Sequence, residues 1–277
     1  MNNEIEISPV YKSLTLEIEA LTKEYSILWE ERDRLINQTK PVLLVKYNLE
    51  IGQYILGYLN KHVYLLQLKR KIELLQIHIN QNKPIEMKEI EKILDEEFRE
   101  WIEKVSSLER EVRFARNSSF ELVNEEKFKQ VQEIYRKLVR QLHPDLNKEL
   151  TDNQKILWNR IQEAYKNLDL EELTNLEILA NGTNTVSEFS SLDVLTKRKE
   201  SLWNKLQDLT NSLTAVKQSF PLSLEQELND PNWLNKEVEV YQNKIKEIET
   251  ILPEYEKMYQ SILYQLYGAM GEHPENL

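Results

Sequence analysis

The sequence predicts an all-α protein in which long antiparallel coiled-coil arms flank a compact helical insert. Glycine and proline are scarce, with 5 and 8 in 277 residues, which leaves few places for tight turns and strand ends. Charged residues make up 30% of the chain and hydrophobic residues 40%, a balance typical of long amphipathic helices. Apolar residues recur in alternating steps of four and three on both sides of the insert, which is the heptad pattern of coiled coils.

The N-terminal region, 1–116, contains three expected helices. A heptad seam that begins at Ile7 predicts the first helix at about 8–37. The stretch 37–41 ends in a proline and breaks this seam, so a second helix is expected at about 42–80, folded back on the first as an antiparallel hairpin. A further break at NQNKP precedes a third helix at about 85–116, with apolar residues on one face.

The central region, 117–182, and the C-terminal region, 183–277, complete the predicted organisation. Shorter helices are expected at about 124–142 and 152–168, followed by the linker LANGTNTVS. The heptads then return, and they predict an antiparallel hairpin of helices at about 190–220 and 233–267. Pro253 lies inside the last heptad run, where it is expected to kink the helix or to start a new one.

The seams also bear on assembly. Short connections favour pairing of the arms within one chain over pairing between chains. Arg32 and Lys199 occupy seam positions, where a buried charge needs a partner, and this weakens a long parallel dimer in that register. We therefore expect an extended monomer or a weak dimer.

Composition excludes several classes of function. The net charge of −11 disfavours binding to nucleic acid or anionic membranes, except through a local basic patch. The runs at 69–71 and 197–199 are basic, but on an acidic chain they are better interpreted as solvated helix faces. The chain has no cysteine, no Gly-rich phosphate loop, no signal peptide and no apolar run of membrane-spanning length. We expect a cytoplasmic protein without a cofactor.

The most informative segment is YRKLVRQLHPDLN, residues 135–147, which joins a helical pattern to the tripeptide His143-Pro144-Asp145. One face of the expected helix is apolar, and the other is basic although Glu133 interrupts it. The apolar face consists of Val131, Ile134, Tyr135, Leu138 and Leu142, and the basic face of Lys129, Arg136 and Arg140, with Lys137 at its edge.

The following segment supplies a partner for the apolar face. It carries a second apolar stripe, and Thr151 and Asp152 precede it where a helix N-cap is expected. The stripe consists of Leu157, Trp158, Ile161, Ala164, Tyr165 and Leu168. Two antiparallel helices are therefore expected to pack together, with His143-Pro144-Asp145 at the exposed tip of their hairpin.

This segment resembles the J-domain of DnaJ-type co-chaperones. The resemblance rests on the HPD tripeptide, the basic helix before it and the helix WNRIQEAYKNL after it, and it covers roughly a quarter of the chain. It implies that the basic face and the HPD loop dock on a DnaK-type ATPase and stimulate ATP hydrolysis. The implied partner-binding residues are His143, Pro144, Asp145, Lys129, Arg136, Lys137 and Arg140.

Other features of typical DnaJ proteins are missing from the sequence. No short helix with a tyrosine and a Leu-Gly pair precedes Glu125, and the long helix ending near Arg116 is the candidate to take its place. The chain also has no Gly/Phe-rich linker and no cysteine-based zinc module. The substrate-binding parts of typical DnaJ proteins are therefore absent, and any client would bind to the coiled-coil arms.

Two functional classes follow from these patterns, and neither is enzymatic. His143 and Asp145 have no nucleophile or second metal ligand near them in sequence, and His62, His78 and His273 lack ligand spacing. The first class is a J-domain co-chaperone, which an exposed HPD loop would support. The second is a structural or interaction protein with a relic J-domain, which burial of the loop against the arms would support.

Overall fold

The computed structural model describes residues 9–81, 86–118, 125–181 and 191–270, and within them the protein is all-α, as the sequence predicts. None of these residues forms a β-strand. The α-helices are α1 (Pro9–Arg34), α2 (Lys40–Tyr47), α3 (Gln53–Asn80), α4 (Met87–Glu97), α5 (Arg99–Asn117), α6 (Glu125–Leu142), α7 (Asp152–Lys166), α8 (Leu170–Asn181), α9 (Leu192–Gln218) and α10 (Pro231–Met270).

The described residues form two compact units, and each unit combines two distant segments of the chain. The first unit comprises Met1–Val42 and Phe120–Leu224, and the second comprises Leu43–Ser119 and Glu225–Leu277. The sequence predicts three consecutive regions instead. The difference arises because a heptad seam shows that a helix needs a partner and does not say which helix provides it.

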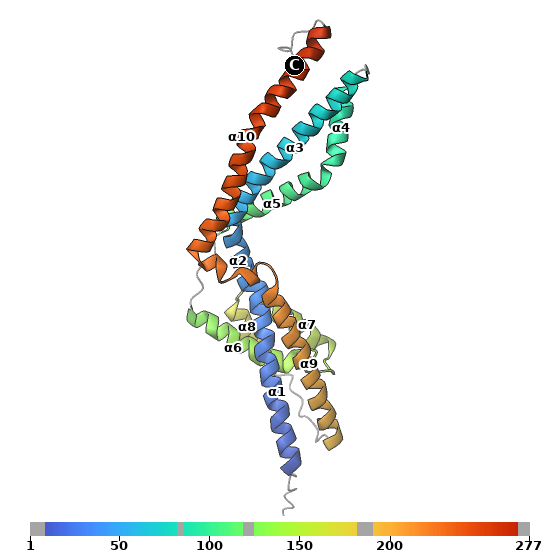
Figure 1. Ribbon diagram of the computed structural model, residues 1–277. Coiled ribbons are helices and arrows are strands. Elements are labelled where there is room, and N and C mark those ends of the chain that lie inside the picture. Colours follow the sequence, from blue (N-terminus) through green and yellow to red (C-terminus); the bar gives the residue numbers. More distant parts are fainter. Residues whose placement is uncertain (1–8, 82–85, 119–124, 182–190, 271–277) are drawn as a thin grey trace, which may run out of the picture. The chain divides into compact units, whose positions relative to one another are not determined.

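In the first unit, α1 and α9 lie side by side and run parallel (Figure 1). Contacts between them advance in the same direction along both helices: Lys199 pairs with Glu17, and Arg32 Nε donates to Ser212 Oγ at 3.2 Å. The two charges predicted to lie in the seams therefore have polar partners on the facing helix. Both predicted antiparallel hairpins are wrong for these helices, because α9 pairs with α1 and α10 pairs with α3.

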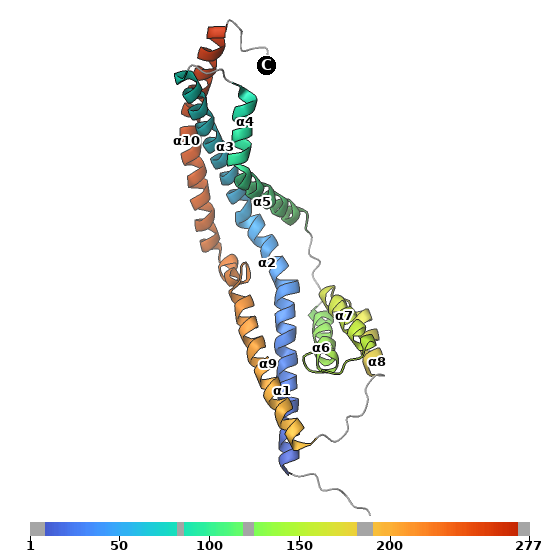
Figure 2. The ribbon, with the colours of Figure 1, turned by 90° about the vertical axis from the view of Figure 1, so that its right-hand side faces the viewer.

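Helices α6, α7 and α8 pack together in the same unit (Figure 2). Tyr25 of α1 and three leucines of α9 join their hydrophobic core, so the insert and the long helices share one core. The buried residues of the insert include Val131, Tyr135, Leu138, Leu142, Leu157, Trp158, Ile161, Tyr165, Leu173 and Leu176, and the leucines of α9 are Leu202, Leu206 and Leu209.

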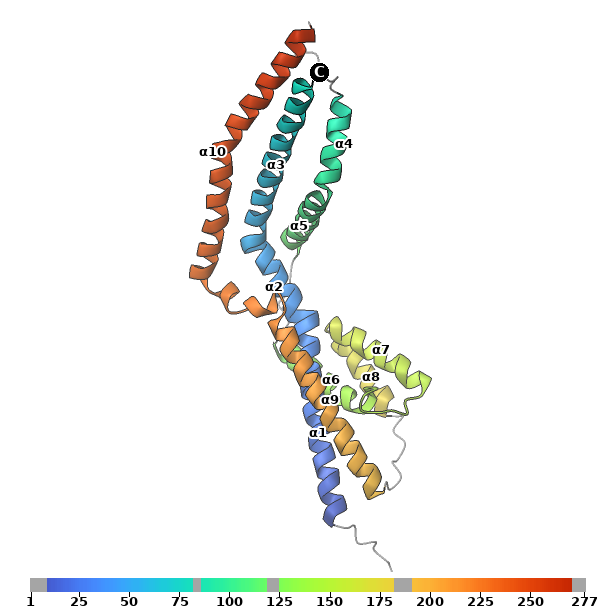
Figure 3. The same ribbon diagram turned by 45° about the vertical axis from the view of Figure 1, so that its right-hand side comes forward.

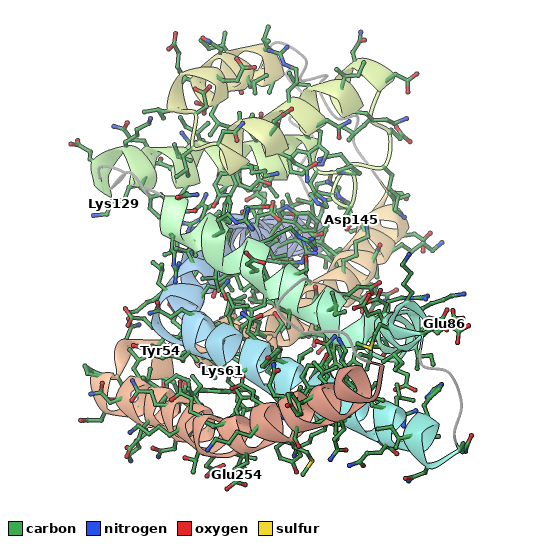
Figure 4. The ribbon with its side chains drawn as sticks, turned by 90° about the horizontal axis from the view of Figure 1, so that it is seen from above. Tyr54, Lys61, Glu86, Lys129, Asp145 and Glu254 are labelled. Carbon is green, nitrogen blue, oxygen red and sulfur yellow. The ribbon has the colours of Figure 1, made fainter. Side chains whose placement is uncertain are left out.

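In the second unit, α3 lies between α10 and the pair α4 and α5 (Figure 3). Helices α3 and α10 also run parallel: Lys61 forms an ion pair with Glu249 at 3.0 Å, and the Tyr64 hydroxyl donates to Glu256 at 3.5 Å. Lys61 and Tyr54 lie on α3 where it passes α10 (Figure 4). Leu68, Ile72, Leu75, Ile90, Leu94 and Ile262 are buried in this unit's core.

The break predicted at 37–41 is absent, and helical hydrogen bonding continues past Pro41. A π-helical segment at Leu35–Thr39 precedes the proline, and the backbone N–H of Lys40 donates to the carbonyl of Leu35. Proline has no N–H and its ring clashes with the carbonyl four residues earlier in a regular α-helix. The π-helical segment changes the hydrogen-bond register by one residue, which allows the helix to accommodate the proline. A second π-helical segment lies at Asn48–Gly52.

Three further differences concern single elements. Helix α10 continues through Pro253, so the proline starts no new helix, and the predicted alternative of a kink stays a prediction. The predicted third helix is divided at Phe98 into α4 and α5. Helix α8 was not predicted, and it follows Leu168, whose φ of 53° turns the chain away from α7. The predicted linker at 179–187 begins inside α8, and its remainder lies outside the described residues.

Candidate partner-binding site

The HPD loop is built on the C-terminal end of α6. The backbone N–H of His143 donates to the carbonyl of Val139 at 2.9 Å, and the carbonyl of His143 accepts from the N–H groups of Leu146 and Asn147 at 3.0 Å each. Pro144 and Asp145 are exposed between these hydrogen bonds. The N–H of Asp145 donates to Nδ1 of His143 at 3.0 Å, which closes the loop on the histidine ring.

The His143 side chain faces inward, and only 3% of the residue is exposed. Its ring lies edge-on to Trp29 and Trp158, with centroid distances of 3.9 and 5.0 Å. Burial lowers the pKa of His143 to about 4, although the carboxylate of Asp145 acts in the opposite direction. The imidazole is therefore neutral at pH 7, in agreement with an Nδ1 that accepts a hydrogen bond.

Asp145 is exposed, yet its side chain contacts both long helices of the unit. The hydroxyl of Tyr25 in α1 donates to Oδ2 at 2.9 Å, and Nζ of Lys205 in α9 lies 3.4 Å from Oδ1. Nζ of Lys205 also donates to the carbonyl of Asp145. Burial alone would raise the pKa of Asp145, but the Tyr25 hydrogen bond and the Lys205 charge outweigh it and lower the pKa.

Arg136 and Lys137, which belong to the predicted basic residues, face carboxylates of the same chain. Arg136 donates from Nη2 and Nε to Oε2 of Glu30, at 2.7 and 3.2 Å. Lys137 lies 3.7 Å from a carboxylate oxygen of Glu133 and 3.5 Å from one of Glu177.

The other two basic residues lie at opposite ends of α6. Lys129 is exposed near the start of the helix, while Asp145 follows its end (Figure 4). Arg140 is half-buried, and its backbone carbonyl accepts from Nδ2 of Asn147 at 3.2 Å. Arg140 therefore lies close to the loop both in sequence and in the structure, whereas Lys129 lies at the far end of the helix.

A buried acidic pair on α1, which the sequence analysis missed, anchors the insert. Glu30 is 1% exposed and accepts from the hydroxyl of Tyr165 at 2.6 Å as well as from Arg136. Asp33, 8% exposed, accepts from the hydroxyl of Tyr135, and its pKa is raised by burial. The sequence carries little signal for this pair: Asp33 continues the four-residue spacing of Tyr25 and Trp29, and Glu30 lies three residues before Asp33 on the same helix.

Helix α1 occupies the position next to α6 that the sequence analysis assigned to the helix ending near Arg116. Helices α1 and α6 are in direct contact, whereas α5, which contains Arg116, belongs to the other compact unit. Expectation and structure differ because the contacts of α1 with the insert join residues more than a hundred positions apart, such as Tyr25 and Asp145, so only the three-dimensional packing shows that α1 covers α6.

The remaining histidines do not form a metal site within the described residues. His62 stacks on Tyr58 with a centroid distance of 5.2 Å, and a ring nitrogen of His78 hydrogen-bonds to the carbonyl of Leu74 at 2.9 Å. His273 lies outside the described residues. No group of three potential metal-ligating side chains gathers in the part of the chain that the structure describes, and no helix there is long and apolar enough to span a membrane.

Comparison of the chain with protein-family models, curated proteins and solved structures found no match. The resemblance to J-domains therefore rests on the sequence of the segment from Tyr135 onward. The structure shows, in addition, that the HPD loop is closed by a hydrogen bond after a partly basic helix and that it contacts α1 and α9.

Proposed function

We propose that the protein is a J-domain co-chaperone whose HPD loop and basic helix dock on a DnaK-type ATPase in the cytoplasm and stimulate ATP hydrolysis. The observation that supports this best is the exposure of Pro144 and Asp145 in a loop closed by His143, directly after a helix that carries Arg136 and Arg140. In a chain of net charge −11, this is a local concentration of basic residues next to a chemically distinctive turn.

The docking chemistry follows from these side chains. A negatively charged patch on the ATPase would be attracted to the basic side of α6, so docking should weaken as the salt concentration rises. The carboxylate of Asp145 would pair with an arginine of the ATPase, which is the geometry of a strong bidentate interaction. Pro144 restricts the loop, which lowers the entropy lost on docking.

The long helices would then serve as coiled-coil arms that hold a client or another partner. In this proposal the protein brings the ATPase to whatever the arms bind, and it has no hydrolytic activity of its own. The seam charges Arg32 and Lys199 are satisfied within the chain, which supports a monomer or a weak dimer over a long parallel dimer.

A structural or interaction protein with a relic J-domain is the second candidate. It is favoured by the contacts of the loop: His143 is buried, and Asp145 and Arg136 have polar partners on α1 or α9. A surface that evolved only to pack against its own chain would show the same contacts. The two candidates differ in whether stimulation of an ATPase depends on the carboxylate of Asp145.

Single-turnover ATP hydrolysis by the DnaK-type chaperone of the same cell tests the proposal. Wild-type protein is expected to accelerate hydrolysis, and Asp145→Asn, which removes the charge and keeps the shape, is expected to abolish the acceleration. Loss of a desolvated charge pair typically costs about 2–5 kcal/mol. Asp152→Asn is the matched control, because Asp152 is an exposed carboxylate at the start of α7 that pairs with Lys155. Equal acceleration by wild type and Asp145→Asn would favour the relic.

A further inference from the structure

We propose that Tyr25 and Lys205 form a latch that holds the HPD loop against α1 and α9, so that a docking partner has to break the contacts of these two side chains with Asp145. This inference rests on the proposed function and names a form of regulation for the same site. The latch residues lie 120 and 60 residues from Asp145 in sequence, so only the folded unit brings them to the loop.

Both carboxylate oxygens of Asp145 are engaged by the latch. Oδ2 accepts from Tyr25 at 2.9 Å, and Oδ1 lies 3.4 Å from the ammonium of Lys205. A bidentate arginine of a partner would donate one hydrogen bond to each of these two oxygens, in the plane of the carboxylate. It would also approach the positive charge of Lys205, which opposes a second cation until that lysine moves away.

The two latch residues differ in how firmly they are held. Tyr25 is 1% exposed, and its ring stacks on Trp29 and lies edge-on to His143. Burial raises the pKa of its hydroxyl, so it remains a donor at all ordinary pH values. The side chain of Lys205 is 25% exposed and that of Asp145 is 51% exposed. Water therefore reaches the Lys205–Asp145 pair, and such pairs exchange readily.

The basic side of α6 is compensated in a similar way. Arg136, the basic residue nearest the middle of the helix, donates to the buried carboxylate of Glu30 on α1. The carboxylate of Asp145 and the guanidinium of Arg136 thus both have partners of opposite charge within the chain. Because Glu30 is buried and also bound by Tyr165, this pair stays in place, and the contacts of Asp145 are the part that can open.

The test uses Tyr25→Phe, Lys205→Met and the double variant in the full chain. Tyr25→Phe removes only the hydroxyl and keeps the ring in the core. Lys217→Met is the matched control, because Lys217 is also on α9 and pairs with Glu31 of α1 at 2.7 Å without contacting the loop. The first measurement is the protein concentration that gives half-maximal stimulation of the DnaK-type ATPase.

We expect each single substitution to lower that concentration about threefold and the double substitution to lower it about tenfold, from the usual strengths of a hydrogen bond and a partly exposed ion pair. The second measurement is hydrogen exchange of the amides of Asp145, Leu146 and Asn147, which should become faster in the double variant. Neither quantity should change in Lys217→Met.

The outcomes separate the latch from the proposed function. Unchanged exchange in the double variant, or an unchanged or higher half-maximal concentration, would overturn the latch while leaving stimulation by the wild type in place. A higher concentration would mean that Tyr25 and Lys205 position Asp145 for docking. Faster exchange with no stimulation by wild type or by any variant would overturn the proposed function, and the regulatory role would be lost with it.

Discussion

Glu30→Gln should loosen the insert from α1 without leaving a cavity. The wild-type carboxylate is 1% exposed and accepts hydrogen bonds from Tyr165 and Arg136. A glutamine has the same shape but only one acceptor oxygen, and its amide group is a donor. With the glutamine oxygen toward Tyr165, Arg136 faces another donor. With the oxygen toward Arg136, the hydroxyl of Tyr165 has to rotate to accept from the amide, and its own proton loses its acceptor.

The expected cost follows from these two partners. Tyr165 is fully buried, and a buried donor that loses its acceptor costs about 1–3 kcal/mol. The Arg136 side chain is 37% exposed, so water replaces part of what it loses. We therefore expect a destabilisation of about 2 kcal/mol, near the middle of that range, which corresponds to roughly a thirtyfold increase in the opening equilibrium.

Native-state hydrogen exchange, read by mass spectrometry on peptides from α6 and α7, measures this opening without requiring the two units to unfold together. Glu17→Gln is the control, because Glu17 is on the same helix and pairs with Lys199 of α9, but it is exposed and contacts no part of the insert. If exchange in α6 and α7 changes less than threefold, or equally in both variants, the buried pair does not anchor the insert.

Two further predictions concern pH and backbone packing. Burial places the folded-state pKa of His143 at about 4, below its ordinary 6.5, so the unfolded chain takes up the proton first as the pH drops. The free energy of unfolding should therefore fall between pH 6.5 and pH 4, by on the order of 3 kcal/mol. Urea titrations at several pH values measure this fall, and His143→Gln should make it smaller. Gly52→Ala should lower the melting temperature, because the new Cβ would lie 2.6 Å from Oδ1 of the buried Asn48. Gly57→Ala should raise it, because its Cβ would meet only Ile245 at an ordinary 3.6 Å and alanine favours the helix. A melt by circular dichroism in which both glycine variants shift in the same direction would contradict the packing argument.

The helices themselves were largely predictable, because their apolar residues repeat at the helical period. The observed ends of α6, at Glu125 and Leu142, lie within one residue of the predicted 124 and 142. Their partners were not predictable, because α1, α3, α9 and α10 carry similar stripes. An apolar stripe shows that a helix packs against another helix, but it does not identify that helix. Nearness in sequence did not identify it either.

The candidate site was predictable only on the α6 side. The loop residues and the basic residues belong to one short segment, and their pattern is local. The partners Glu30, Tyr25 and Lys205 come from two other helices, so nothing near the HPD tripeptide indicates them. A buried carboxylate on a long helix has no distinguishing pattern in sequence, because exposed glutamates have the same spacing.

The parallel pairing of α1 with α9 has a consequence for synthesis of the chain. Helix α1 ends at Arg34 and its partner begins at Leu192, so at usual elongation rates roughly ten to thirty seconds separate their emergence from the ribosome. Throughout that interval Tyr25 and its apolar neighbours lack the leucines of α9 that complete their core. Non-local contacts of this kind slow folding and leave apolar surface open to aggregation. A chain that terminates before α9 would leave this surface without the leucines that complete it.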